Sequence, residues 1–177
     1  REETEISKNA LSVSSVAIEL AAGDIGDLAN CQMLVIGAGD AGRLAARAAK
    51  ERGVSRIGVV SRTRERASEL AMELGGLPIS MSNLAEELTT CDLVVACADA
   101  PHHLLDVSTL KTAMMHRPQV PLVIIDIAVP RNVTPAVAQI NNVFLYNIDD
   151  LTSISEQNRK QREGEIEKAD EIITSEV

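Results

Sequence analysis

Short apolar runs alternate with segments of helical period along most of the chain. Each run is apolar on successive residues, which is typical of strands covered on both faces in a parallel sheet. The runs are Met33–Ile36, Ile57–Val60, Leu93–Cys97, Leu122–Ile125 and Val143–Leu145, and a shorter strand is expected around Ile79. Between them, apolar residues three and four positions apart predict helices from Ala41 to Arg52 and from Ala67 to Leu74, and another opened by Ser82 or Asn83. Repeated β–α–β units of this kind predict an α/β fold with a doubly wound parallel sheet.

A helix is predicted on each side of this unit. Residues 1–23 form a lead-in segment and helix, with one apolar face made by Val13, Val16, Ala17, Leu20 and Ala21. Residues 24–151 form the sheet domain. Residues 152–177 are mostly charged and predict the start of a long helix interrupted at Gly164, whose apolar stripe is Ile166, Ala169, Ile172, Ile173 and Val177. Because the chain begins at Arg1 without Met and ends inside this pattern, we expect one domain of a longer protein.

Composition narrows the classes of function. Of the 177 residues, 45% are hydrophobic, enough for a core, but only 1% are aromatic, too few for a binder that stacks nucleic-acid bases. The formal charge of −9 repels a phosphate backbone and an anionic membrane surface. Apolar runs of about six residues are far shorter than the roughly 20 needed to cross a bilayer, and no leader is recognisable, so no membrane partner is expected.

Cysteine and histidine usage predicts neither disulfides nor a metal site. Cys31, Cys91 and Cys97 form no even set and no CxxC pair, and the three histidines do not complete a zinc spacing. A reducing compartment, the cytoplasm, is therefore expected.

A glycine motif lies where the first strand meets the first helix of the sheet domain. The segment Gly37-Ala38-Gly39-Asp40-Ala41-Gly42 fits GxGxxG and lies between a predicted strand and a predicted helix. In such a motif the first glycine permits the turn, the second lets a pyrophosphate approach the backbone, and the third lets the helix pack on the strand. The free N–H groups and partial positive charge of the helix amino end favour phosphates. The sequence therefore predicts a Rossmann-like dinucleotide site.

The residues after the second strand indicate which dinucleotide binds. NAD sites usually place Asp or Glu there to accept hydrogen bonds from the ribose hydroxyls. Here Ser61-Arg62-Thr63-Arg64-Glu65-Arg66 follows the strand, so hydroxyl and guanidinium groups stand where the acid is expected. Arg62 can pair with a 2′-phosphate and stack on adenine, with Ser61, Thr63 and Arg66 beside it. NADP(H) is therefore the predicted cofactor, although Arg64 and Arg66 are explained equally well as solvated charges.

The loops after the fourth and fifth strands are predicted to border the nicotinamide, because ligands of this fold lie beyond the carboxyl ends of the strands. Ala98, Ala100 and Ile127 are the residues expected there. A segment from Asn147 to Leu151 is expected as a third loop, after the sixth strand.

Other reactive side chains are better explained structurally. His102 and His103 follow Pro101 in a polar loop, and the cysteines near the fourth strand resemble small buried residues. Asp126 is expected to brace its loop, and no Tyr-x-x-x-Lys pair exists because Asp150 follows Tyr146 at that spacing. No catalytic residue is therefore predicted within the chain.

Taken in order, several motifs resemble the nicotinamide-binding domain of glutamyl-tRNA reductases. They are 12–17 (SVSSVA), the glycine loop 37–42, 61–63 (SRT) with 65–67 (ERA), 100–102 (APH), 126–131 (DIAVPR) and 146–151 (YNIDDL). The fifth and sixth are specific to that family, whereas the glycine loop is shared with many dehydrogenases.

The resemblance implies reduction of the glutamyl group of glutamyl-tRNA to glutamate-1-semialdehyde with NADPH, in tetrapyrrole biosynthesis. In that family a cysteine of a separate N-terminal domain carries the glutamyl group as a thioester, and a C-terminal region forms a homodimer. That cysteine motif is absent here, so the resemblance implies that glutamyl-tRNA is bound through other domains and that this chain is inactive alone. Two alternatives stay open: a shikimate-dehydrogenase-like NADP reductase domain, and a dinucleotide sensor without catalysis.

Overall fold

One parallel sheet organises the molecule. The computed structural model describes residues 2–175, with side chains for Lys8 and from Val13 onward, so Val177 of the predicted stripe lies outside the described residues. The strand order is β3-β2-β1-β4-β5-β6, and every pairing is parallel. The strands are β1 (Gln32–Ile36), β2 (Arg56–Val60), β3 (Leu77–Ile79), β4 (Leu93–Ala96), β5 (Leu122–Asp126) and β6 (Val143–Asn147). The predicted doubly wound sheet is confirmed.

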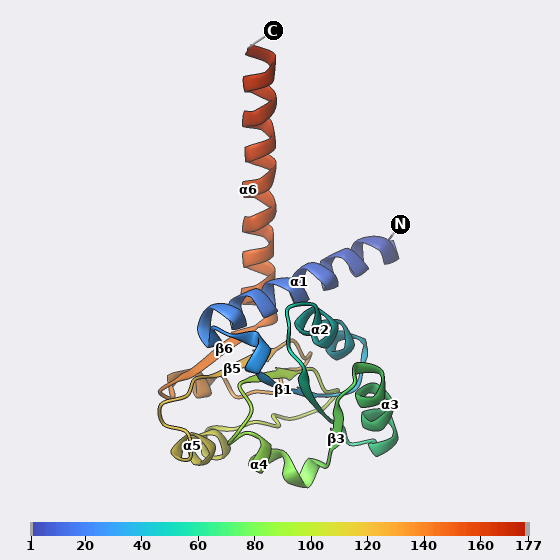
Figure 1. Ribbon diagram of the computed structural model, residues 1–177, viewed down its shortest axis with the longest axis vertical. Coiled ribbons are helices and arrows are strands. Elements are labelled where there is room, and N and C mark those ends of the chain that lie inside the picture. The colour runs from blue at the N-terminus through green and yellow to red at the C-terminus, as the bar shows by residue number, and fades with distance from the viewer. Residues whose placement is uncertain (1, 176–177) are drawn as a thin grey trace.

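Helices cover both faces of this sheet (Figure 1). One face packs against α1 (Glu2–Ile25), α2 (Asp40–Glu51), α3 (Arg64–Leu74) and the short η1 (Leu28–Asn30). The other face packs against α4 (Leu84–Glu87), α5 (Val107–Met115) and η3 (Pro135–Gln139), with η2 (Met81–Asn83) leading into α4. The last helix, α6 (Ile148–Ser175), stands out from the sheet domain beyond its contact with α1.

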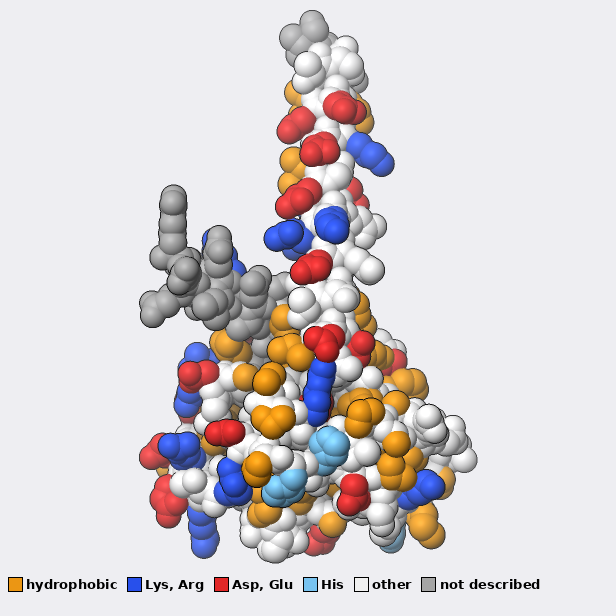
Figure 2. Space-filling view, turned by 180° about the vertical axis from the view of Figure 1, so that it is seen from behind, with side chains coloured by type: hydrophobic (Ala, Val, Ile, Leu, Met, Phe, Trp, Pro, Cys, Tyr) orange, Lys and Arg blue, Asp and Glu red, His pale blue; other side chains and the backbone are white. Residues whose placement is uncertain are grey.

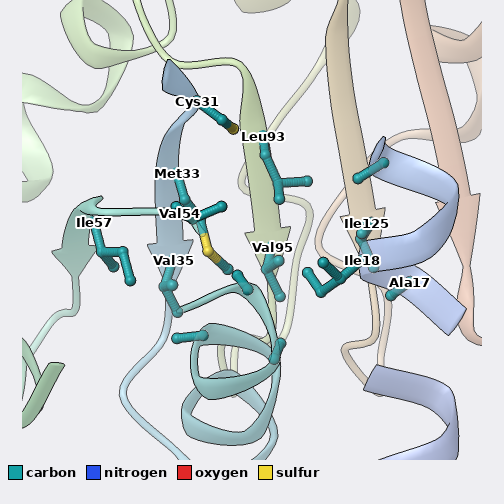
Figure 3. Packing of buried hydrophobic residues seen from close by; sticks show 14 of the residues in the cluster. Ala17, Ile18, Cys31, Met33, Val35, Val54, Ile57, Leu93, Val95 and Ile125 are labelled. Carbon is teal, nitrogen blue, oxygen red and sulfur yellow. The ribbon is translucent and has the colours of Figure 1, made fainter. Parts of the chain in front are cut away.

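The core is two apolar layers separated by the sheet. Alternate residues of each central strand enter opposite layers: Met33 and Val35 face α1 and α2, whereas Leu34 and Ile36 face α4 and α5. Figure 3 shows the first layer, where Ile18 of α1 meets Ile125 and Val95 of the sheet. Burial on both faces explains why the strand sequences are continuous apolar runs instead of alternating ones.

Both flanking helices are longer than the sequence predicts. The lead-in helix passes Gly23 and ends at Ile25, before Gly26 in the left-handed region (φ +93°). The expected loop from Asn147 to Leu151 is wrong, because Asn147 ends β6 and α6 begins at Ile148. The physical reason is a reciprocal cap: the N–H of Asn147 donates to Asp150 Oδ2 and the N–H of Asp150 to Asn147 Oδ1, both at 3.0 Å.

One further helix prediction needs correction, and another is confirmed. The interruption expected at Gly164 is wrong, since α6 runs unbroken through it; one glycine costs a helix only about 1 kcal/mol relative to Ala. The helix predicted to open at Ser82 or Asn83 is confirmed, with Asn83 as the N-cap of α4, and it is short. It consists of η2 and the four residues of α4, after which Thr89 and Thr90 turn their hydroxyls onto carbonyls of the preceding turn. Within the described part of the chain, no helix has the length and apolarity needed to cross a membrane.

A buried arginine joins the amino ends of the two strands β4 and β5. Arg117, 5% exposed, donates from Nη1 to the carbonyl oxygens of Leu88 and Cys91 and from Nη2 to that of Pro121 at 2.9 Å. Its Nη2 also lies 3.6 Å from Asp92 Oδ1. The guanidinium therefore donates to carbonyl groups of two loops at this edge of the sheet.

Replacing this arginine tests its structural role. Arg117→Met keeps the apolar stem but leaves buried carbonyls without a donor, so we expect the free energy of unfolding to fall by about 2–4 kcal/mol. Urea denaturation measures it. Arg52→Met, at the exposed end of α2, is the matched control and is expected to change stability by less than about 0.5 kcal/mol. Equal effects of the two substitutions would show that the buried hydrogen bonds of Arg117 add nothing to the stability of the fold.

Candidate functional site

The glycine loop is held between the ends of β2 and β4. The N–H of Gly37 donates to the carbonyl of Val60, the last residue of β2, at 2.8 Å. Gly37 has φ +110°, and a Cβ there would lie 2.8 Å from Cα and N of Ala98, just after β4. Both the backbone conformation and the close approach therefore require glycine at this position.

The third glycine of the motif lets α2 lie against the sheet. A Cβ on Gly42 would lie 2.7 Å from Cys97 Sγ and 3.0 Å from Val35 Cγ1. The absence of a side chain at Gly42 therefore lets α2 pack closely on the sheet. The amino end of α2 then lies at the carboxyl edge of the sheet.

The second glycine faces open space. A Cβ on Gly39 would meet nothing within 4 Å, and Gly39, Asp40 and Ala41 are all exposed. Gly39 is the N-cap of α2, and no side chain caps the helix there. Peptide N–H groups at the amino end of this 12-residue helix are thus available to an anion.

The segment after β2 carries hydroxyls and guanidiniums. Ser61 Oγ accepts from the N–H of Thr63 at 3.2 Å, and Thr63 begins α3 as its N-cap. Arg62 is exposed and donates through Nη2 to the carbonyl of Asp99, which links the ends of β2 and β4. Among the described residues, no carboxylate forms an ion pair with Arg62, Arg64 or Arg66.

The loops after β4 and β5 are joined by two buried polar side chains. Asp126, 1% exposed, accepts from the N–H groups of Ala128, Asn132 and Val133 at 2.9–3.1 Å. Asn132, 0% exposed, accepts from the N–H of Ala98 at 2.8 Å and donates to its carbonyl at 3.1 Å. Asp126 thus braces its loop, as the sequence predicts.

The sequence analysis predicts no role for Asn132. The available signal is an amide side chain six residues after a carboxylate that ends a strand, since such a side chain can bond to main-chain groups of a nearby loop.

The remaining reactive side chains do not form a catalytic set. Burial raises the pKa of Cys31, Cys91 and Cys97 to about 12, so each thiol stays protonated at neutral pH. His103 Nδ1 lies 3.1 Å from Thr134 Oγ1, and both His102 and His103 are exposed. Among the residues described, no three His, Cys, Asp or Glu side chains gather as metal ligands.

A hollow of about 400 Å³ lies beside the glycine loop. Ala41 of α2 and Ile127 line it, together with residues of α1 and α6 that include Ser14 and Thr152. The carboxyl edge of the sheet therefore collects the glycine loop, Arg62, Ala98 and Ile127. A hollow of about 590 Å³ beside β2 and β3 contains none of the predicted site residues.

Comparison with known proteins places the chain in a family. The sequence profile described as "Shikimate / quinate 5-dehydrogenase" matches residues 19–154. The chain belongs to this family. Over 175 residues it is 43% identical to glutamyl-tRNA reductase of Natranaerobius thermophilus, covering 99% of this chain and 38% of that protein. The expected resemblance to glutamyl-tRNA reductases is confirmed, and the chain spans about two fifths of the length of such relatives.

Solved structures agree with this assignment. Glutamyl-tRNA reductase from Methanopyrus kandleri has a TM-score of 0.86 and 40% identity, covering 99% of this chain and 44% of that one. The nucleotide-binding domain of the Thermoplasma volcanium reductase, at 17% identity and TM-score 0.66, shares the fold, with 86% of this chain and 96% of that one covered. The chain therefore has a Rossmann-type fold.

The open space at Gly39 gives a test of where a dinucleotide lies. Gly39→Ala adds a Cβ that touches no protein atom, so we expect stability to change by less than about 1 kcal/mol. At the predicted cofactor site the same Cβ would occupy the surface expected to face the pyrophosphate, so we expect dinucleotide affinity to fall tenfold or more. Fluorescence titration and thermal melting measure the two effects. Gly164→Ala, also with open space, is the control and should leave affinity unchanged; unchanged affinity in Gly39→Ala would place the ligand elsewhere.

Proposed function

We propose that this chain is the NADPH-binding domain of a glutamyl-tRNA reductase, which reduces the glutamyl group of glutamyl-tRNA to glutamate-1-semialdehyde. The observation that carries the proposal is the turn after β2: Ser61, Arg62 and Thr63 stand at the carboxyl edge of the sheet, beside an uncapped helix amino end and without an acid. Similarity to such reductases over the whole chain supports the same conclusion.

The residues of this edge fit a dinucleotide phosphate. Gly39 leaves open space at the amino end of α2, and no side chain caps the N–H groups there. Ala38, Asp40, Ala41 and Gly42 complete the segment that would hold the pyrophosphate. NADPH, when bound, supplies a hydride for the acyl carbon; the chain itself binds and orients the cofactor.

The choice of NADPH over NADH follows from charge. An acid after β2 would accept hydrogen bonds from the ribose hydroxyls but would repel a 2′-phosphate. Arg62 instead offers guanidinium N–H donors besides the one bonded to the Asp99 carbonyl, and Arg66 lies in the first turn of α3. In this arrangement Ala98 and Ile127, both partly exposed, border the nicotinamide end, whereas Ala100 is only 2% exposed.

The acyl chemistry belongs outside this chain. All three thiols are protonated at neutral pH, since burial raises their pKa to about 12, and none provides a thiolate for the glutamyl group. A cysteine of another domain would carry that group, and tRNA contacts would lie there as well. The whole enzyme is proposed to be a cytoplasmic homodimer that serves tetrapyrrole biosynthesis.

Reversing the charge of Arg62 tests the cofactor. Arg62→Glu removes a phosphate partner and adds repulsion, so we expect NADPH affinity to fall by about tenfold to hundredfold and NADH affinity to change little. Calorimetric titration of both cofactors measures this. Arg64→Glu makes the same charge change two residues away and should affect NADPH far less. An equal loss of both cofactors in Arg62→Glu would overturn the NADPH assignment.

A second candidate is a reductase acting on a shikimate-type hydroxy acid. The family match over residues 19–154 favours it, because the name of that family describes such dehydrogenases. This candidate shares the NADPH site, so only the substrate separates it from the first.

Complementation separates the two candidates. The full-length gene is expected to restore growth of a strain that lacks glutamyl-tRNA reductase and requires a tetrapyrrole precursor. A strain without shikimate dehydrogenase is the control, and it should not be rescued. With soluble protein expressed in both strains, the reverse outcome would replace the first candidate with the second.

A further inference from the structure

Asn132 holds one residue of the cofactor edge by both of its main-chain groups. Its Oδ1 accepts from the N–H of Ala98 at 2.8 Å, and its Nδ2 donates to the carbonyl of the same residue at 3.1 Å. The side chain is 0% exposed, so water cannot replace either bond. A side-chain amide paired in this way fixes the main chain of Ala98 as a neighbouring strand would.

Asn132 is itself fixed from three sides. Its N–H donates to Asp126 Oδ2 at 3.0 Å, and its carbonyl accepts from the N–H groups of Leu104 and Leu105 at 2.6 and 3.1 Å. Asp126 is held in turn by the N–H groups of Ala128 and Val133. Neither the backbone nor the amide of Asn132 is therefore free to adjust, and a buried, fully bonded network of this kind is rigid.

Ala98 is the contact between this network and the rest of the edge. A Cβ on Gly37 would lie 2.8 Å from Cα and N of Ala98, so the glycine loop cannot move toward it. The next residue, Asp99, offers its carbonyl to Arg62. A shift of Ala98 would thus displace the loop that faces the pyrophosphate and the arginine that faces the 2′-phosphate.

We propose that Asn132 is a positioning residue for the cofactor, acting through the main chain of Ala98. It touches no ligand itself; it sets the separation of the glycine loop from the loop after β4. The proposal rests on the proposed dinucleotide site, and it adds the residue that gives this site its shape.

Two substitutions test the proposal together. Asn132→Asp keeps the size of the side chain and an acceptor for the Ala98 N–H, but it has no donor for the Ala98 carbonyl. Asn132→Ala removes both bonds without adding charge. We expect each to weaken both NADPH and NADH by tenfold or more, because the displaced glycine loop faces the pyrophosphate that the two cofactors share. NADPH should lose at least as much affinity as NADH, because Arg62 shifts with Asp99.

A control at the other edge of the sheet separates positioning from general destabilisation. Asn142 also donates a side-chain amide to a carbonyl, that of Pro118 at 2.8 Å, but at the amino edge of the sheet. Asn142→Ala should lower the melting temperature and leave both dissociation constants within twofold of the wild type. All titrations are run at 25 °C, well below each melting temperature.

The outcomes are distinct. Wild-type affinity in both Asn132 variants overturns the positioning role, and so does an equal loss in Asn142→Ala, since affinity would then follow stability alone. If the wild-type chain binds neither NADPH nor NADH, the proposed dinucleotide site fails and the positioning role fails with it. Loss in both Asn132 variants, with the Asn142 variant unaffected, supports the proposal.

Discussion

The close approach of Gly37 to the main chain of Ala98 is the constraint on which the site depends. Because β1 lies between β2 and β4, the loop that follows it has a neighbour on each side. Val60 holds it by a hydrogen bond on one side, and Ala98 blocks it on the other. The loop is therefore confined between its two neighbours, and its turn places the amino end of α2 at the carboxyl edge of the sheet.

Much of this arrangement could be predicted from the sequence because single strands and turns carry local signals. Continuous apolar runs such as Met33–Ile36 indicate strands buried on both faces, and the three glycines of the motif have separate steric requirements that the contacts of Gly37 and Gly42 illustrate. The expectation that Asp126 braces its loop also follows from local chemistry, since a carboxylate after a buried strand has N–H groups within reach.

Most of the features that could not be predicted depend on residues far apart in the chain. The role of Asn132 exists only because Ala98, 34 residues earlier, lies beside it, and nothing in either segment states that proximity. The start of α6 at Ile148 was not predicted for a different reason. Asn147 and Asp150 cap the helix locally, but β6 passes into α6 without a connecting loop, and the sequence analysis expected a loop there. Tyr146, like Asn132, contacts a residue far away in the sequence: its hydroxyl donates at 2.6 Å to Asp24, which is 122 positions away.

The net charge of −9 requires that attraction for an anionic cofactor be local. Figure 2 shows acidic and basic side chains spread along the projecting part of α6, away from the sheet domain. At physiological ionic strength charges are screened beyond about 8 Å, so this remote acidity contributes little at the carboxyl edge. There, Arg43 pairs with Asp40 at 2.9 Å and with Glu73 at 3.0 Å, which neutralises the one carboxylate in the first turn of α2. Arg62 and the amino end of α2 then supply positive charge at the site, even though the chain as a whole is acidic.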